Sequence, residues 1–167
     1  EDFYENGQEQ YSPGLTAILS PEPAKDSLVQ ALSRRSCYAT TGERIILGLN
    51  IAGTGIGGEL STKAKPGLAI NRHIVGYIAG TSALKEVALI RNGTPVKIFS
   101  TKDYFLDFAY DDSEHLSKFA LASPDDRPHF AFYYLRVTQQ NGHMAWSSPI
   151  WIDYPEFQGP VKKAKTK

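Results

Sequence analysis

The clearest indication of the fold lies in residues 133–152, which read YYLRVTQQNGHMAWSSPIWI. Two β-rich runs flank Asn141-Gly142, a dipeptide that tolerates the positive φ angles of tight hairpin turns. The segment therefore predicts a β-hairpin. Pro149 has no amide hydrogen to donate to a neighbouring strand, so we expect its strand to lie at a sheet edge or to carry a bulge there.

Short β-rich runs of the same kind begin at Arg44, and a second turn dipeptide stands at Asn92-Gly93. The longest expected loop covers residues 111–128, with a helical turn at 114–122. Seven short strands in about 110 residues are typical of an immunoglobulin-like or fibronectin-like β-sandwich. We therefore predict a mainly β domain over residues 44–153, with strands near residues 45–51, 68–79, 86–91, 96–100, 104–110, 130–139 and 144–152.

The segment before this domain has a different pattern. Residues 14–19 are typical of a short buried strand, and residues 20–36 predict a helix with Leu28, Ala31 and Leu32 on one face. A strand followed by a helix is half of a β/α unit, which cannot be a domain alone. We therefore expect residues 12–43 to be a strand–helix segment that packs on the sandwich or on a partner.

Composition sets further limits. The 167 residues carry 18 basic and 18 acidic side chains, which argues against a nucleic-acid or membrane partner held by charge alone. The sequence shows neither a secretory signal nor a membrane-spanning stretch, and it leaves the compartment open. Cys37 is the single cysteine, so no intramolecular disulfide forms. Residues 1–11 are expected to be a flexible acidic N-terminal segment, and residues 154–167 a disordered basic tail.

Two sequence patterns resemble known ligand-binding motifs, but the residues around each one argue against binding. Residues 53–58 read GTGIGG and satisfy the dinucleotide-binding pattern GxGxxG, but no apolar helical face and no second β/α unit follow. A loop or bulge between strands is the favoured interpretation. Residues 111–114, DDSE, offer oxygen ligands but lack the glycine and spacing of a calcium-binding loop, so we expect a solvated acidic loop.

The histidines give no metal-binding pattern. None of them stands in HxH, HxxxH or HExxH spacing, and no GxSxG nucleophile motif is present. We therefore assign no catalytic, cofactor-binding or metal-binding residue in this chain, and expect surface or strand positions for His73, His115, His129 and His143.

One polar cluster and one aromatic group remain as candidates for binding. The polar cluster could contact a phosphate, a carboxylate or another domain, although capping the helix and joining it to the sandwich is the favoured interpretation. It consists of Arg34, Arg35, Thr40, Thr41 and Arg44. The aromatic residues could stack on a sugar or a base, although a place in the core is favoured. They are Phe130, Phe132, Tyr133, Tyr134, Trp146 and Trp151.

Four blocks in order resemble a specific family. The blocks are GLTAI (14–18), ALSRRSCYATTGERI (31–45), VALIRNG (87–93) and NGHMAWSSPIW (141–151). They resemble the C-terminal part of a family of unknown function that is related to the PHP superfamily, named after polymerase and histidinol phosphatase. In that family a metal-binding β/α barrel is followed by a β-sandwich, and residues 12–43 resemble the last strand and helix of that barrel, a remnant placed before the sandwich. The resemblance covers roughly residues 12–153, whereas residues 53–58 depart from the family's usual loop.

The resemblance implies a parent protein whose barrel binds divalent metals and hydrolyses a phosphoester. The family's ligand motifs lie upstream of GLTAI, and residues 1–11 contain no histidine, so no ligand is carried over. We expect a non-catalytic accessory sandwich that braces the barrel or mediates assembly, with the barrel or a second copy as partner. The alternatives are a carbohydrate- or peptide-binding module and a stand-alone metal-dependent enzyme.

Overall fold

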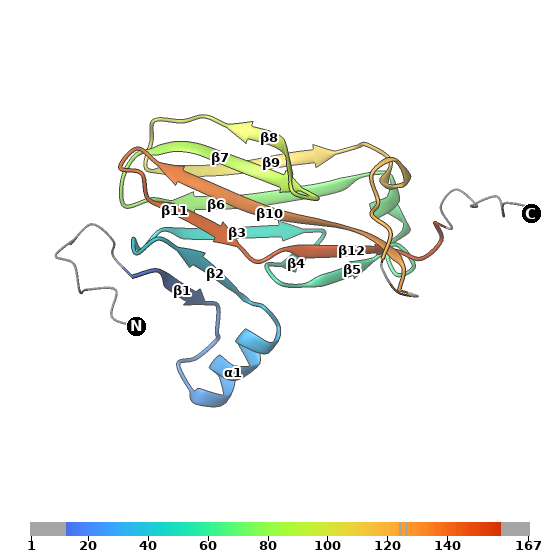
Figure 1. Ribbon diagram of the computed structural model, residues 1–167, viewed down its shortest axis with the longest axis horizontal. Helices are drawn as coiled ribbons and strands as arrows, with labels where there is room; N and C mark the ends of the chain where they lie inside the picture. The colour runs from blue at the N-terminus through green and yellow to red at the C-terminus, as the bar shows by residue number, and fades with distance from the viewer. Residues whose placement is uncertain (1–12, 124, 126, 158–167) are drawn as a thin grey trace, which may run out of the picture.

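The computed structural model describes residues 13–123, 125 and 127–157, and there the chain forms two β-sheets and one short α-helix (Figure 1). The predicted mainly β, sandwich-like fold is thereby confirmed. The helix is α1 (Lys25–Ser33), and two 3₁₀ turns cover Pro66–Ala69 and Leu116–Lys118. The strands are β1 (Leu15–Ile18), β2 (Cys37–Thr40), β3 (Ile46–Ile51), β4 (Thr54–Gly55), β5 (Glu59–Ser61), β6 (Arg72–Ala79), β7 (Leu84–Arg91), β8 (Thr94–Phe99), β9 (Phe105–Asp112), β10 (His129–Gln139), β11 (Met144–Ser147) and β12 (Ile150–Tyr154).

The larger sheet is built around β10. This strand pairs antiparallel with β7 on one side and with β11 and β12 on the other. Beyond β7 lies β8; beyond β11 lie β2 and then β1; β5 runs parallel to β12. The smaller sheet has the order β4-β3-β6-β9, and all its pairs are antiparallel.

The core lies between the two sheets and follows from the alternation of side chains along each strand. In β10 the inward set is Ala131, Tyr133, Leu135 and Val137, all fully buried. The smaller sheet contributes Leu47, Leu49, Ile51, Ile74 and Ile78 from β3 and β6. Each fully buried aliphatic side chain contributes about 1.5–3 kcal/mol relative to an exposed one.

The two Asn-Gly dipeptides behave differently. Asn92 (φ 51°) and Gly93 (φ 83°) both have positive φ between the paired residues Arg91 and Thr94, as a two-residue type I′ turn requires. At the second dipeptide only Gly142 has positive φ, and the link between β10 and β11 is four residues long. The predicted hairpin is confirmed with a wider turn.

The bulge expected at Pro149 is present. Trp146 pairs with Arg136 and Ile150 pairs with Tyr133, so three residues of the outer strand face two residues of β10. Pro149 is one of the three. Its carbonyl accepts a hydrogen bond of 3.1 Å from the amide of Gly57, which lies outside this hairpin.

The predicted strand and helix are both present, but the helix is shorter than expected. The expectation of a buried strand was wrong, because β1 lies at the edge of the larger sheet and its residues are exposed or half-buried. Pro21 and Pro23 precede the helix, Ala24 is extended, and the first helical hydrogen bond runs from the Leu28 amide to the Ala24 carbonyl. The helix therefore begins at Lys25. Its flanking strands β1 and β2 pair antiparallel with each other, and β2 continues into the larger sheet through β11 (Figure 1).

Some expectations fall outside the described residues. The predicted acidic segment at residues 1–11 and residues 158–167 of the predicted basic tail are outside the part of the chain that the structure describes. The predicted domain boundaries stay predictions. Within the described part of the chain, no helix is long and apolar enough to cross a membrane.

A buried ionic cluster joins the two sheets. Arg72 and Asp112 are paired residues of the smaller sheet, and their side chains form an ion pair of 3.0 Å with 0% and 4% exposure. Tyr133, on the facing sheet, donates a hydrogen bond of 2.6 Å to Asp112 and accepts one of 3.2 Å from Nε of Arg72. The expectation of a solvated acidic loop at residues 111–114 was therefore wrong for Asp112, which is buried at the end of β9.

The rest of the cluster satisfies the remaining polar groups. The other guanidinium nitrogens of Arg72 donate to the carbonyls of Leu68 and Glu114. Arg91, the strand partner of Tyr133, donates to Asp112 at 2.9 Å, and its guanidinium carbon lies 3.7 Å from the ring centre of Phe119. A buried charge is tolerated only when it is paired and hydrogen-bonded, and this cluster meets that condition.

We expect Asp112→Ala to lower the free energy of unfolding by about 3–5 kcal/mol, because it leaves Arg72 buried without its counter-charge. Urea denaturation at neutral pH measures the change. Asp111→Ala is the matched control, because that neighbouring carboxylate is 57% exposed and should matter far less. Equal effects of the two substitutions would contradict the role given to the cluster.

Acid should weaken the same cluster. Burial alone would raise the pKa of Asp112, but the hydrogen bond from Tyr133 and the charges of Arg72 and Arg91 outweigh it, so this pKa lies below its ordinary value. A lowered carboxyl pKa gives stability that is present above the unfolded-state pKa and is lost as the pH falls through the folded-state pKa. We expect Asp112→Asn to flatten the fall of unfolding free energy below about pH 4; an unchanged slope would refute this.

Candidate functional site

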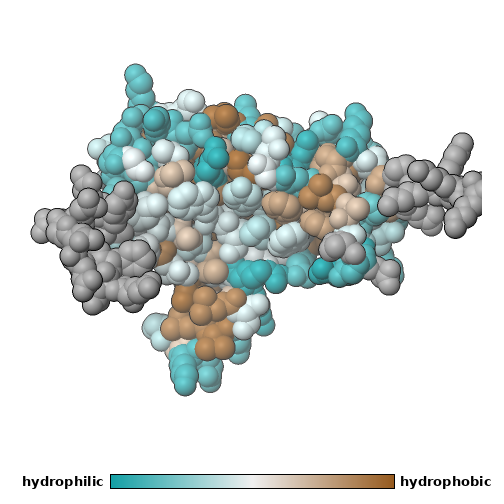
Figure 2. Space-filling view, viewed as in Figure 1, coloured by the Kyte–Doolittle hydropathy of each residue, from teal (hydrophilic) through white to brown (hydrophobic). Residues whose placement is uncertain are grey.

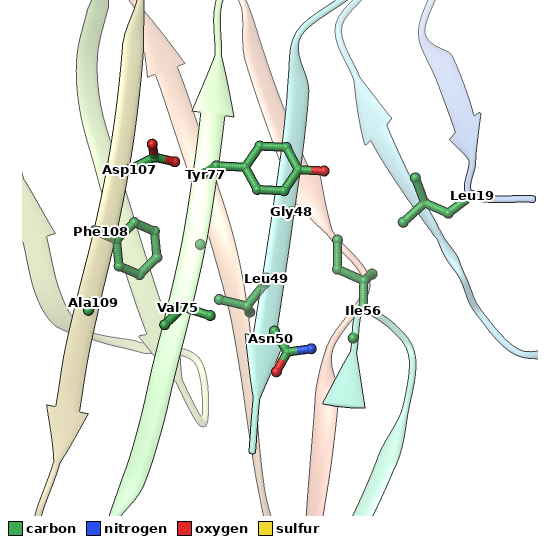
Figure 3. A pocket seen from close by; sticks show the side chains of 12 residues that line it. Leu19, Gly48, Leu49, Asn50, Ile56, Val75, Tyr77, Asp107, Phe108 and Ala109 are labelled. Carbon is green, nitrogen blue, oxygen red and sulfur yellow. The ribbon is translucent and has the colours of Figure 1, made fainter. Parts of the chain in front are cut away.

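The outer face of the smaller sheet carries a groove. Its volume is about 670 Å³, and its lining is mainly apolar. Gly48 and Gly55 occupy outward positions on β3 and β4 and contribute no side chain to the groove. The lining residues are Leu19, Gly48, Leu49, Asn50, Gly55, Ile56, Val75, Gly76, Tyr77, Asp107, Phe108 and Ala109 (Figure 3).

Gly48 permits the position of the largest side chain in the groove. Gly48 and Tyr77 are paired residues of β3 and β6, and Figure 3 shows the Tyr77 ring extending across the glycine. A Cβ atom at residue 48 would lie 2.3 Å from the tyrosine ring, so only glycine leaves room for it. Val75 and Tyr77 are 38% and 46% exposed, which leaves an apolar surface open on this face.

A second apolar surface belongs to residues 13–43, which we call the lead-in. Leu15, Leu19, Val29 and Leu32 are all exposed there, and Ala31 is the one buried residue of α1. Figure 2 shows a hydrophobic patch on the part of the molecule where Figure 1 places α1. Leu19 belongs both to this set and to the lining of the groove, so the two surfaces meet at that residue.

The polar cluster expected from the sequence is divided by β2. Arg34 and Arg35 follow α1; their amides cap the helix by donating to the carbonyls of Gln30 and Leu32, and Arg35 forms an exposed ion pair with Glu59 of β5. Thr40 and Thr41 lie at the opposite end of β2. This arrangement joins the lead-in to the larger sheet and does not gather the five side chains into one site.

Thr41 and Arg44 occupy different environments. The Thr41 hydroxyl lies 3.0 Å from Nδ1 of His143 and accepts a hydrogen bond of 2.9 Å from the Met144 amide, which holds β2 against β11. The second ring nitrogen of His143 lies 3.8 Å from Glu43. Arg44 is exposed. The hydroxyl is thus engaged in joining two strands.

The histidines are widely separated. His73 contacts Asp111 at 3.0 Å, His115 contacts Ser117 at 2.8 Å, and the ring of His129 lies 5.0 Å from that of Phe157. The hydrogen bonds from His73 and Asn71 lower the pKa of Asp111. Among residues 13–123, 125 and 127–157, no three His, Cys, Asp or Glu side chains converge closely enough to hold a metal ion.

The aromatic residues do not fill the core as expected, except for Tyr133. Phe130, Phe132 and Tyr134 alternate with the inward residues of β10, and they therefore lie half-buried on the outer face of the larger sheet. Trp146 and Trp151 lie half-buried on the same face, from β11 and β12. The expectation was wrong because both faces of β10 are apolar, so alternation alone could not tell which one turns inward.

The glycines of residues 53–58 have a structural role. Gly53 and Gly57 have φ angles of 87° and 81°, which favour glycine. The Gly57 amide donates to Pro149, and a Cβ atom at residue 57 would lie 2.2 Å from the carbonyl oxygen of Arg35. The segment passes close against the lead-in and the bulge of the larger sheet, as the loop interpretation predicts.

We expect Gly57→Ala to cost about 1–3 kcal/mol of unfolding free energy more than Gly53→Ala. Both substitutions meet the strain of positive φ, but only residue 57 also meets backbone atoms, since nothing lies within 4 Å of a Cβ atom at residue 53. Urea denaturation of both variants measures the difference. Equal costs would mean that the contact with Arg35 is unimportant.

One family model matches the first part of the chain. Residues 2–67, which include β1, α1 and β2 to β5, match the model of the family described as "Protein of unknown function (DUF3604)". No solved structure gives a significant match to the chain.

The chain is also similar to three uncharacterized proteins of Chlamydia. It is 51% identical to one from Chlamydia muridarum over 152 residues, which is 91% of this chain and 24% of that protein. The identities to proteins of Chlamydia pneumoniae and Chlamydia trachomatis are 52% and 50%, over 92% and 90% of this chain. The chain therefore spans about a quarter of the length of the curated relatives it matches.

Proposed function

We propose that this chain works as a non-catalytic accessory β-sandwich of a longer protein, and that its lead-in and groove dock onto the rest of that protein. The parent would be a PHP-like metal-dependent hydrolase, a phosphoesterase by analogy, as the sequence resemblance implies. Its metals and its catalytic residues would lie in the barrel. The sandwich would brace the barrel or hold subunits together.

The exposed apolar side chains of α1 are the observation that carries the proposal. A nine-residue helix is too short to persist in water by itself, and helices in proteins depend on burial of an apolar face. Val29 and Leu32 are 54% and 47% exposed, so the sandwich leaves that face of α1 uncovered. Another surface is needed to cover it.

The groove and the relatives support the same occupant. An exposed apolar surface that continues into a groove is typical of an interaction site. The relatives are about four times as long as the matched segment, so in them a large body of protein is tethered to the equivalent of this sandwich. Tethering raises the effective concentration of a docking partner, so a modest apolar surface is sufficient for stable contact.

Hydrogen exchange tests the docking in a chimaera in which this chain replaces the matched quarter of the Chlamydia muridarum relative. We expect the amides of α1 to exchange about tenfold more slowly in the chimaera than in the 167-residue chain alone, because docking covers the helix. Leu32→Glu in the chimaera should restore fast exchange.

Ile98→Glu is the matched control, since Ile98 on β8 is 49% exposed, close to the 47% of Leu32. It should leave the exchange of α1 slow. Equally fast exchange with and without the rest of the relative would refute docking. Slow exchange that depends on protein concentration would instead identify a second copy as the occupant.

A further inference from the structure

A second cavity lies on the opposite side of the sandwich, over the outer face of the larger sheet. Its volume is about 460 Å³. Phe130 of β10, Trp151 and Asp153 of β12, and Glu59 of β5 line it, and Arg35 reaches it from the lead-in. The cavity therefore combines aromatic rings with carboxylates and a guanidinium group.

The register of the strands explains why these side chains meet. Trp151 pairs with Phe132 on one side and with Glu59 on the other. In the next outward row Asp153 pairs with Phe130. Neighbouring residues on one face of a sheet lie about 5 Å apart, so the sheet itself fixes the spacing of rings and carboxylates.

The aromatic rings form one continuous surface. The ring centres of Phe130 and Phe132 lie 5.4 and 5.0 Å from that of Trp151. Tyr134 extends the row, with its ring centre 6.4 Å from that of Phe132 and an angle of 13° between the ring planes. These rings are half-buried on the outer face of the larger sheet, away from the core between the two sheets. They therefore remain accessible to a ligand.

The charges of the cavity are balanced. Two basic groups, Arg35 and Arg127, line it together with two acidic groups, Glu59 and Asp153. Arg35 pairs with Glu59. Asp153 is half-buried, and this burial together with the charge of Glu59 raises the pKa of its carboxyl, while Arg127 opposes the change.

We propose that this cavity binds a neutral sugar of an oligosaccharide, with one pyranose ring on the aromatic surface of Trp151 and Phe130 and its hydroxyls hydrogen-bonded by Asp153, Glu59 and Arg35. Sugar rings expose apolar C–H faces that pack on aromatic rings, and their hydroxyls donate to carboxylates and accept from guanidinium groups. Both kinds of partner stand side by side here.

The balance of charge favours a neutral ligand over an ionic one. An anion would meet Glu59 and Asp153, and a cation would meet Arg35 and Arg127. A peptide that binds by adding a strand uses a sheet edge, whereas Trp151 stands on the face of β12, which is paired on both sides. The site is separate from the groove, so its test does not depend on docking.

Isothermal titration calorimetry of the 167-residue chain with cellohexaose, maltohexaose and N-acetylchitohexaose tests the proposal. We expect saturable binding of at least one of the three sugars. Trp151→Ala should weaken that binding about tenfold or more through loss of the stacking surface. Asp153→Asn, which keeps the shape of the side chain, should weaken it several-fold.

Trp146→Ala is the matched control, because Trp146 lies on the same face but pairs with Arg136 and Ala39, outside the cavity. It should leave the affinity unchanged. Binding of none of the three sugars, equal losses from both tryptophan variants, or full affinity in Asp153→Asn would each overturn the proposal. If Trp151→Ala does not fold, as judged by circular dichroism, Asp153→Asn decides.

Discussion

The ion pair of Arg72 and Asp112, buried between the sheets, is the constraint on which the rest of the structure depends. Arg72 cannot leave the interior without exposing the core around it, and it cannot stay there without Asp112 and Tyr133. These groups come from paired residues of the smaller sheet and from the central strand of the larger one. The cluster therefore favours one alignment of the two sheets over others that an apolar core alone would tolerate.

That alignment also determines what the outer faces carry. Side chains alternate along a strand, so an inward Arg72 places Val75 and Tyr77 outward, where they line the groove. By the same rule an inward Tyr133 places Phe132 outward, next to Trp151. A shift of either strand by one residue would exchange its two faces, bury the residues that line the groove or the cavity and expose the core.

The sequence predicts most of the longer strands and both hairpins, because alternation and Asn-Gly turns are local signals. It does not reveal β2, β4 or β5, which have two to four residues and depend on partners far away in the chain. The ionic cluster could have been predicted from the sequence. Arg72 is separated from Ile74 and Ile78 by even numbers of residues and so lies on the same apolar face of the strand, where a charged residue needs a buried partner. The cavity is only partly visible in the sequence: Phe130, Trp151 and Arg35 are among the binding candidates, but Glu59 lies on an unrecognised strand, and only the pairing of β5 with β12 brings it to them.

The lead-in connects the two candidate surfaces, and this has a physical consequence. Leu19, before α1, lines the groove of the smaller sheet, whereas Arg35, after α1, lines the cavity of the larger sheet. Arg35 has a positive φ of 57°, and its carbonyl is packed so closely against Gly57 that no side chain fits between them. The backbone that presents Arg35 to the cavity is therefore held by its contact with Gly57, directly after the helix that a docked partner would cover. Along the chain, the nine-residue helix α1 therefore lies between the surface proposed for docking and the cavity proposed for the ligand.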